Sequence, residues 1–88
     1  MSAKGMDVDA VRRMAQQMSK AAEEVKKLET DLTHRLQEVD WHGPDADQFR
    51  GKWSSEMVPA LQAITRSVED LKGKAEKNLR EQEATSSR

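Results

Sequence analysis

The side chains that could support acid–base or metal chemistry in this sequence are two histidines and a few adjacent carboxylates. His34 and His42 are eight residues apart, and a metal shared by them would require a bent geometry and further ligands that the sequence does not supply. Pairs such as Glu23 and Glu24 lie in charged stretches, where carboxylates are solvated rather than catalytic. The chain has no phosphate-binding glycine loop, nucleophile elbow or zinc-protease motif. We therefore expect a protein that is not an enzyme and has no metal and no cofactor.

Length and composition narrow the class of protein further. The chain has 88 residues, which is enough for one small domain. Its formal net charge is −1 and the two signs are mixed along the sequence, so no nucleic-acid partner is expected. Cysteine is absent, so packing alone must hold the domain together. Ala, Glu, Lys, Leu and Arg make up nearly half of the chain, a bias typical of long helices.

Apolar residues occur only in short runs. The longest run is two or three residues, which predicts no stable membrane insertion. The segment Met1 to Asp9 has no apolar stretch of the kind that a cleaved signal peptide needs. If the protein leaves the cell, we expect it to use another route.

The first half of the chain has the spacing of a long amphipathic helix. Apolar side chains recur every seven residues. A second row accompanies them and consists of Met14 or Ala15, Ala21 or Ala22, Leu28 and Leu36. Asp7 or Asp9 suits the N-cap, so we predict helix one over about 7–40. The residues of this stripe are Val11, Met18, Val25, Leu28, Leu32, Leu36 and Val39.

The second half repeats the pattern over about 45–80. Pro44 suits the first turn of this helix, and Gly43 suits the junction before it. A turn limited to 41–44 forces the helices to run antiparallel. Pro59 predicts a kink or a break near 55–59 in a helix that we otherwise keep continuous. The stripe of helix two comprises Phe49, Trp53, Met57, Leu61, Ile64, Val68 and Leu71.

The ends of the chain are polar. We predict a flexible N-terminus over 1–6, a helical hairpin over 7–80 and a disordered polar tail over 81–88. The hairpin alone buries too little apolar surface to be stable. Ordering the chain costs about 1.5 kcal/mol of conformational entropy per residue, and this offsets nearly all of the free energy gained from burial. The stripe of helix one is also about three heptad positions wide, more than one neighbouring helix can cover. The predicted fold is therefore all-α, an antiparallel helix-turn-helix hairpin that pairs into a four-helix bundle dimer.

The turn carries a short motif. Trp41, His42 and Gly43 lie between two long amphipathic helices, with Pro44 next and Phe49 and Trp53 following at helical spacing. In this arrangement the whole chain resembles the WXG family of small type VII (ESX-like) secretion substrates, the proteins similar to early secretory antigen.

The resemblance implies a partner and a destination. Members of the family form hairpin dimers, of one chain or of two related chains, which an ATPase-driven membrane machine of Gram-positive bacteria exports in folded form. It implies a secreted effector or a co-secreted partner here, with a second copy or a WXG paralogue and the secretion ATPase as partners. The alternative is a cytoplasmic helical adaptor that pairs with another helical protein.

The family's export signal is a C-terminal Tyr followed four residues later by Asp or Glu. This chain has no Tyr, and the nearest match is Leu79 with Glu83. The signal is degenerate here, or a partner chain supplies it, or this lineage lacks it. Without the resemblance, Leu79 would be the end of the helix-two stripe and Glu83 part of a charged tail.

Trp41 has two compatible interpretations. A large indole where helix one ends can cover the open end of a bundle, while Gly43 supplies the backbone geometry beside it. The resemblance implies an additional role, in which Trp41 and the helix ends form a surface that the secretion machinery recognises.

Overall fold

The computed structural model describes residues 6–86, and these form helices and no strand. The elements are α1 (Val8–Glu38), α2 (Pro44–Lys52), η1 (Trp53–Met57) and α3 (Val58–Ser86), where η1 is a stretch of π-helix. Within these residues the predicted all-α class is confirmed. Of the N-terminus predicted to be flexible, residues 1–5 lie outside the described part.

Both ends of α1 fit the predicted helix one closely. Asp7 is the N-cap, and its carboxylate accepts a hydrogen bond from the backbone N–H of Ala10 at 3.0 Å. Asp9 adds a second acid in the first turn, where the positive end of the helix dipole stabilises its negative charge. The helix ends at Glu38 rather than near 40, and Val39 is its C-cap.

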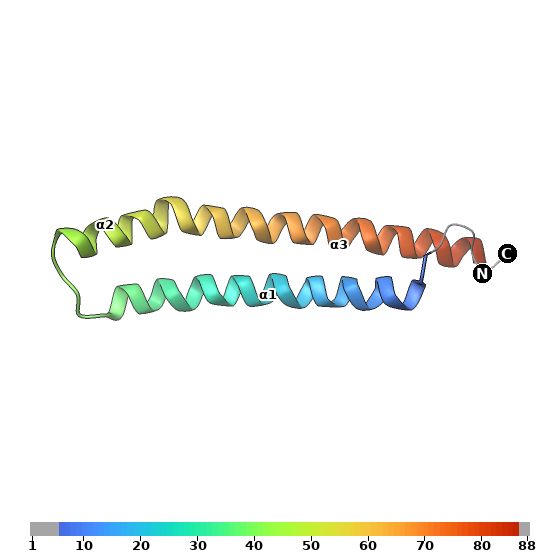
Figure 1. Cartoon of the computed structure of the whole chain (residues 1–88), viewed down its shortest axis with the longest axis horizontal. Coiled ribbons are helices and arrows are strands. Elements are labelled where there is room, and N and C mark those ends of the chain that lie inside the picture. Colours follow the sequence, from blue (N-terminus) through green and yellow to red (C-terminus); the bar gives the residue numbers. More distant parts are fainter. Residues whose placement is uncertain (1–5, 87–88) are drawn as a thin grey trace.

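The second half of the chain is one continuous helix whose hydrogen-bonding pattern changes from α to π and back to α. α2, η1 and α3 follow one another without a break, and Figure 1 shows the ribbon changing direction between α2 and α3. In η1 the backbone N–H of Val58 bonds to the carbonyl of Trp53, five residues back. Pro59 follows immediately, and its missing N–H and its ring fit this wider turn better than a regular α-helix. The bend predicted near Pro59 is thus a π-bulge.

The π-bulge adds one residue to the helix and so shifts every side chain that precedes it. After the bulge, apolar rows repeat every seven residues, as in Leu61 and Val68. Across the bulge the repeat is eight: Trp53 precedes Leu61 by eight, and Phe49 precedes Met57 by eight. The extra residue places Phe49 on the same side of the helix as Met57, and Trp53 on the same side as Leu61.

The two long helices lie side by side and antiparallel (Figure 1). The molecule measures 66 × 17 × 15 Å and its radius of gyration is 19.6 Å. A compact chain of this length would have a radius of gyration of about 12 Å. The hairpin is therefore a rod with little interior.

Small side chains make up most of the core of the hairpin. The buried residues of the described part are Ala15, Ala22, Ala46, Thr65 and Leu79. Four of them are no larger than threonine, which lets the helix backbones approach closely but removes little apolar area from water. A single chain gains correspondingly little free energy from its core.

Hydrogen bonds and an ion pair between α1 and α3 set the register of the two helices. Lys26 donates to the Glu69 carboxylate at 3.1 Å, and Gln62 donates to Glu29 at 3.5 Å. The hydrogen bond and the charge of Glu69, with a smaller effect of Glu23, raise the pKa of Lys26 above its usual value. These contacts place residues 26 and 69 at one level of the hairpin.

The structure differs from the prediction at the C-terminal end. α3 continues to Ser86, through most of the stretch 81–88 that we expected to be disordered. Leu79 is buried against α1 and the carboxylate of Glu83 pairs with Arg12, so contacts with α1 extend beyond residue 80. Residues 87–88 of that stretch lie outside the described part.

Candidate functional site

The turn between α1 and α2 depends on the backbone of Gly43. Its φ of 115° and ψ of 177° belong to a region that is almost restricted to glycine. A Cβ built at this position would meet nothing within 4 Å, so the requirement is conformational and not one of space. Pro44 then begins α2, and the N–H of Asp47 bonds to the carbonyl of Gly43 at 3.0 Å.

Arg50 holds the turn against the end of α1. Its guanidinium donates to the carbonyls of Leu36 at 2.8 Å, Trp41 at 2.9 Å and Val39 at 3.3 Å. These carbonyls belong to the last turn of α1 and the loop beyond it, where the helix supplies no N–H donors of its own. The positive charge of Arg50 is also stabilised by the negative end of the α1 dipole.

Trp41 lies on the surface of the turn. Its side chain is 38% exposed, and its ring meets that of Phe49 edge-on with centroids 5.5 Å apart. The guanidinium of Arg50 is 6.0 Å from the Trp41 ring centroid. Within one chain the indole is therefore not sealed in the end of a core, and it presents an open face beside Phe49.

Trp53 fastens α2 to α1 from the other side of the turn. Its indole N–H donates to the hydroxyl of Thr33 at 2.9 Å, and the ring is half-buried. The π-bulge sets this direction, because it rotates Trp53 relative to the rest of the α3 stripe. Trp53 thus both links η1 to α1 through its hydrogen bond and belongs to the apolar stripe.

None of the large predicted stripe residues between Val11 and Leu71 is buried in the single hairpin. Val11, Met18, Val25, Leu32, Leu36, Trp53, Leu61 and Val68 are half-buried. A second set, which includes Met14 of the second row, is exposed by between 41% and 53%. This set, the apolar face, comprises Met14, Leu28, Val39, Phe49, Met57, Ile64 and Leu71.

Two shallow hollows mark the end of this face nearest the turn. One of about 340 Å³ lies between α1 and α2, and its lining includes Leu32, Val39 and Phe49. The other, of about 300 Å³, lies beside Trp53 and Met57. Their walls are almost wholly apolar. Such hollows suit apolar side chains of another helix rather than a polar small molecule.

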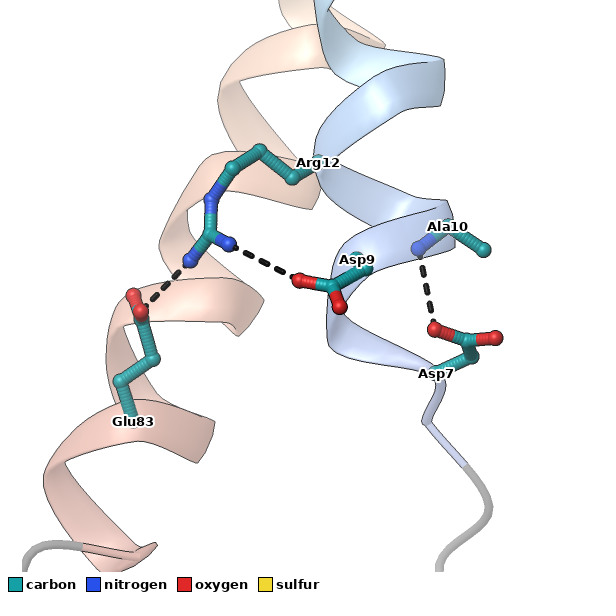
Figure 2. Close-up of polar contacts among 5 residues, drawn as sticks. All are labelled: Asp7, Asp9, Ala10, Arg12 and Glu83. Atoms are coloured by element: carbon teal, nitrogen blue, oxygen red, sulfur yellow. Dashed lines mark hydrogen bonds and ion pairs between the residues drawn. The ribbon is translucent and has the colours of Figure 1, made fainter.

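Leu79 and Glu83, the nearest match to an export signal, both contact α1. Leu79 is only 6% exposed. The Glu83 carboxylate accepts a 2.6 Å bond from Arg12, which also pairs with Asp9 at 3.4 Å (Figure 2). In this hairpin the pair is part of the contact between α3 and the start of α1.

The remaining polar groups form ordinary surface pairs. His34 lies 3.4 Å from Glu38 and His42 lies 2.8 Å from Asp40, all on exposed side chains. Among residues 6–86 no group of three or more histidine or acidic side chains could hold a metal ion. Over the same range no helix is long and apolar enough to cross a membrane.

Two residues that organise the turn were missed by the sequence reasoning. They are Arg50 and Thr33, to which the sequence analysis assigned no role. A signal for Arg50 did exist, because a cation in a helix that directly follows a tight turn can reach the unpaired carbonyls at the end of the preceding helix. No comparable signal indicated Thr33, since its role depends on the π-bulge.

Comparisons of the chain with family models, with curated proteins and with solved structures find no match. The functional argument therefore depends on the residues and the geometry of this chain. Two features stand out in that geometry, namely the turn around Gly43 and Arg50 and the uncovered apolar face.

Proposed function

We propose that this protein is a small WXG-type substrate of a bacterial type VII secretion system, which is exported as a folded helical dimer. In this proposal it acts outside the cell as an effector or as the co-secreted partner of another protein. Its own partner is a second copy or a WXG paralogue, and the secretion ATPase drives its export.

The observation that carries the proposal is the uncovered apolar face. The chain exposes 6,923 Å² of surface, whereas a monomer of its mass would expose about 5,200 Å². The excess of about 1,700 Å² is roughly twice the 800 Å² or so that each partner contributes to a typical stable interface. A second hairpin laid on this face would complete a four-helix bundle with a real core.

The turn supports the same proposal. A Trp-x-Gly turn that joins two long antiparallel helices is the feature in which the sequence resembles WXG proteins, and here Gly43 has a backbone conformation that other residues avoid. Trp41 is open to solvent beside Phe49, so a second chain or the secretion machinery can reach it.

One observation favours the second candidate, a cytoplasmic helical adaptor that pairs with another helical protein. The chain has no Tyr, and the nearest substitute for the export signal is buried at Leu79 and ion-paired at Glu83. Such a protein would use the same apolar face but would stay in the cell.

The experiment that separates the two candidates is an export assay. The protein is followed in culture fluid and in cell lysate, in the parent strain and in a strain lacking the type VII ATPase, with a cytoplasmic enzyme as a lysis marker. Loss from the fluid of the ATPase mutant alone would support secretion. Retention in the cells of both strains would refute it and favour the adaptor.

A further inference from the structure

We infer that the last turns of α3 are held on α1 by a latch, formed by Leu79, Glu83 and Arg12, which must open before a partner can bind Leu79 and Glu83. The latch joins the end of α3 to the start of α1, at the end of the rod opposite the turn (Figure 1). In the proposed function, on which this inference rests, that partner is the export machinery. The latch would then control when the chain is recognised.

Leu79 is the apolar part of the latch. Of the five buried residues in the described part of the chain, it is the only one larger than threonine. It follows the buried Thr65 by two heptads, so both belong to the row of α3 that faces α1. Leu79 and the buried Ala15 line one hollow of about 350 Å³ between the two helices. The largest buried side chain of the hairpin thus lies near the end of α3 and not at its centre.

Glu83 and Arg12 form the polar part of the latch. The Glu83 carboxylate accepts a hydrogen bond from the Arg12 guanidinium at 2.6 Å, and the same guanidinium pairs with Asp9 at 3.4 Å (Figure 2). The side chains of Arg12 and Glu83 are 42% and 52% exposed, so this ion pair alone contributes little stability. The contacts of this end with α1 are thus centred on one leucine and one exposed ion pair, which can open without unfolding the rest of the hairpin.

A partner that binds Leu79 and Glu83 must offer the same chemistry that α1 offers them. The two residues are one helical turn apart on the same side of α3, so the partner needs an apolar hollow with a cation beside it. α1 already supplies both, through the surface at Ala15 and the guanidinium of Arg12. Leu79 is only 6% exposed while it lies on α1. Binding to α1 and binding to the partner are therefore mutually exclusive.

The latch lies away from the apolar face. Arg12 and Lys26 are two heptads apart on α1, and their acidic partners Glu83 and Glu69 are two heptads apart on α3. Both ion pairs therefore lie on one side of the hairpin. Met14 of the apolar face follows Arg12 by two residues, which is about 200° around an α-helix. A second chain on the apolar face would leave the latch uncovered, so the latch can also act in a dimer.

Amide hydrogen exchange of residues 80–86 measures the opening of the latch, because this stretch has no large apolar side chain of its own. Arg12→Gln removes the ion pair with Glu83 and should speed this exchange about two- to fivefold. Lys26→Gln is the matched control. It removes the similarly exposed ion pair with Glu69, two heptads away, and should leave the exchange of 80–86 unchanged. Equal exchange in Arg12→Gln and in the natural chain would overturn the inference.

Ser19 offers a variant of opposite sign that leaves the latch residues in place. It lies midway between Arg12 and Lys26 on α1, at the level of Glu76 on α3. Ser19 and Glu76 line the same hollow as Leu79. An arginine at position 19 would bring a third guanidinium or ammonium group to this side of α1, opposite an acid of α3. Ser19→Arg should therefore slow the exchange of 80–86 about twofold.

The three variants are then compared in the export assay, as the fraction of protein in the culture fluid after a fixed time. A partner that binds only the open form responds to the fraction that is open. Arg12→Gln should therefore raise the exported fraction about two- to fivefold, and Ser19→Arg should lower it, while Lys26→Gln should leave it unchanged.

Two contrary outcomes have different meanings. If Arg12→Gln speeds the exchange of 80–86 but is exported like the natural chain, the latch does not control recognition and the inference is overturned, while the proposed function stands. If the natural chain and all variants stay in the cells of every strain, the proposed function is refuted, and the inference with it.

Discussion

The guanidinium of Arg50 reaches back across the turn and donates to the carbonyl of Leu36 at 2.8 Å. Its other two bonds, to the carbonyls of Trp41 and Val39, enclose the short loop between α1 and α2. One side chain of α2 thus fixes the end of α1, the loop and the position of the neighbouring aromatic rings. This explains how a loop of few residues can hold Trp41 at the surface without a core beneath it.

Replacing Arg50 should weaken the hairpin at its turn. Arg50→Met keeps most of the aliphatic stem but removes all three bonds, and we expect a loss of about 1–2 kcal/mol in unfolding free energy, since the site is partly open to water. Arg66→Met, on the exposed surface of α3, is the matched control and should change stability little. Urea unfolding at one fixed protein concentration measures both. Equal effects of the two changes would mean that the three hydrogen bonds of Arg50 are not important for stability.

Gly43 allows a test that separates conformation from space. A Cβ would meet nothing within 4 Å at either Gly43 or Gly73, yet only Gly43 has a positive φ. Gly43→Ala should therefore cost about 1–2 kcal/mol, whereas Gly73→Ala should stabilise α3 by about 0.5–1 kcal/mol. Thermal unfolding of both variants checks the opposite signs. A neutral Gly43→Ala would show that the turn relaxes into another conformation.

The apolar face can be tested at neighbouring positions. Ile64→Asp places a charge in the centre of the face and should weaken self-association roughly a hundredfold or more, because an unpaired carboxylate would be buried in the dimer. Ala63→Asp adds the same group one residue earlier, where it points away from the face and should leave the mass unchanged. Light scattering over a dilution series distinguishes the two. If Ile64→Asp kept the mass of the natural chain, Ile64 would not be in the interface.

Much of this hairpin could be predicted from the spacing of its apolar residues. The row from Val11 to Val39 and the row from Met57 to Leu71 repeat every seven residues, and both form the long helices that this spacing predicts. Asp7 and Pro44 also begin their helices as their chemistry suggests. These features depend on local propensity and periodicity, which a single sequence contains.

The remaining features depend on contacts between distant segments. The sequence left open whether Met14 or Ala15, and Ala21 or Ala22, belongs to the second apolar row, and the structure buries Ala15 and Ala22. The last turns of α3 looked polar enough to be disordered, yet Leu79 and the pairing of Glu83 with Arg12 connect them to α1. Periodicity identifies an apolar side of a helix, but it does not reveal which part of that side the first neighbour covers.

The π-bulge leads to the last prediction, which concerns one extra residue. Because η1 adds a residue between the row of Trp53 and that of Leu61, a deletion there should convert it to regular α-helix without rotating either row. Deleting Ser55 together with Pro59→Ala, which removes the proline that disfavours such a helix, should leave the unfolding midpoint close to that of Pro59→Ala alone.

The matched control deletes Ser67 in the same Pro59→Ala background. Ser67 lies in the regular part of α3, where losing one residue rotates everything before it by about 100° relative to everything after it. The rows of Ile64 and Leu71 would no longer share a face, so we expect most of the helicity and the self-association to disappear. Circular dichroism and light scattering would report both changes. If the two deletions were equally harmful, the eight-residue spacing across η1 would not be the reason that Phe49 and Trp53 belong to the apolar stripe.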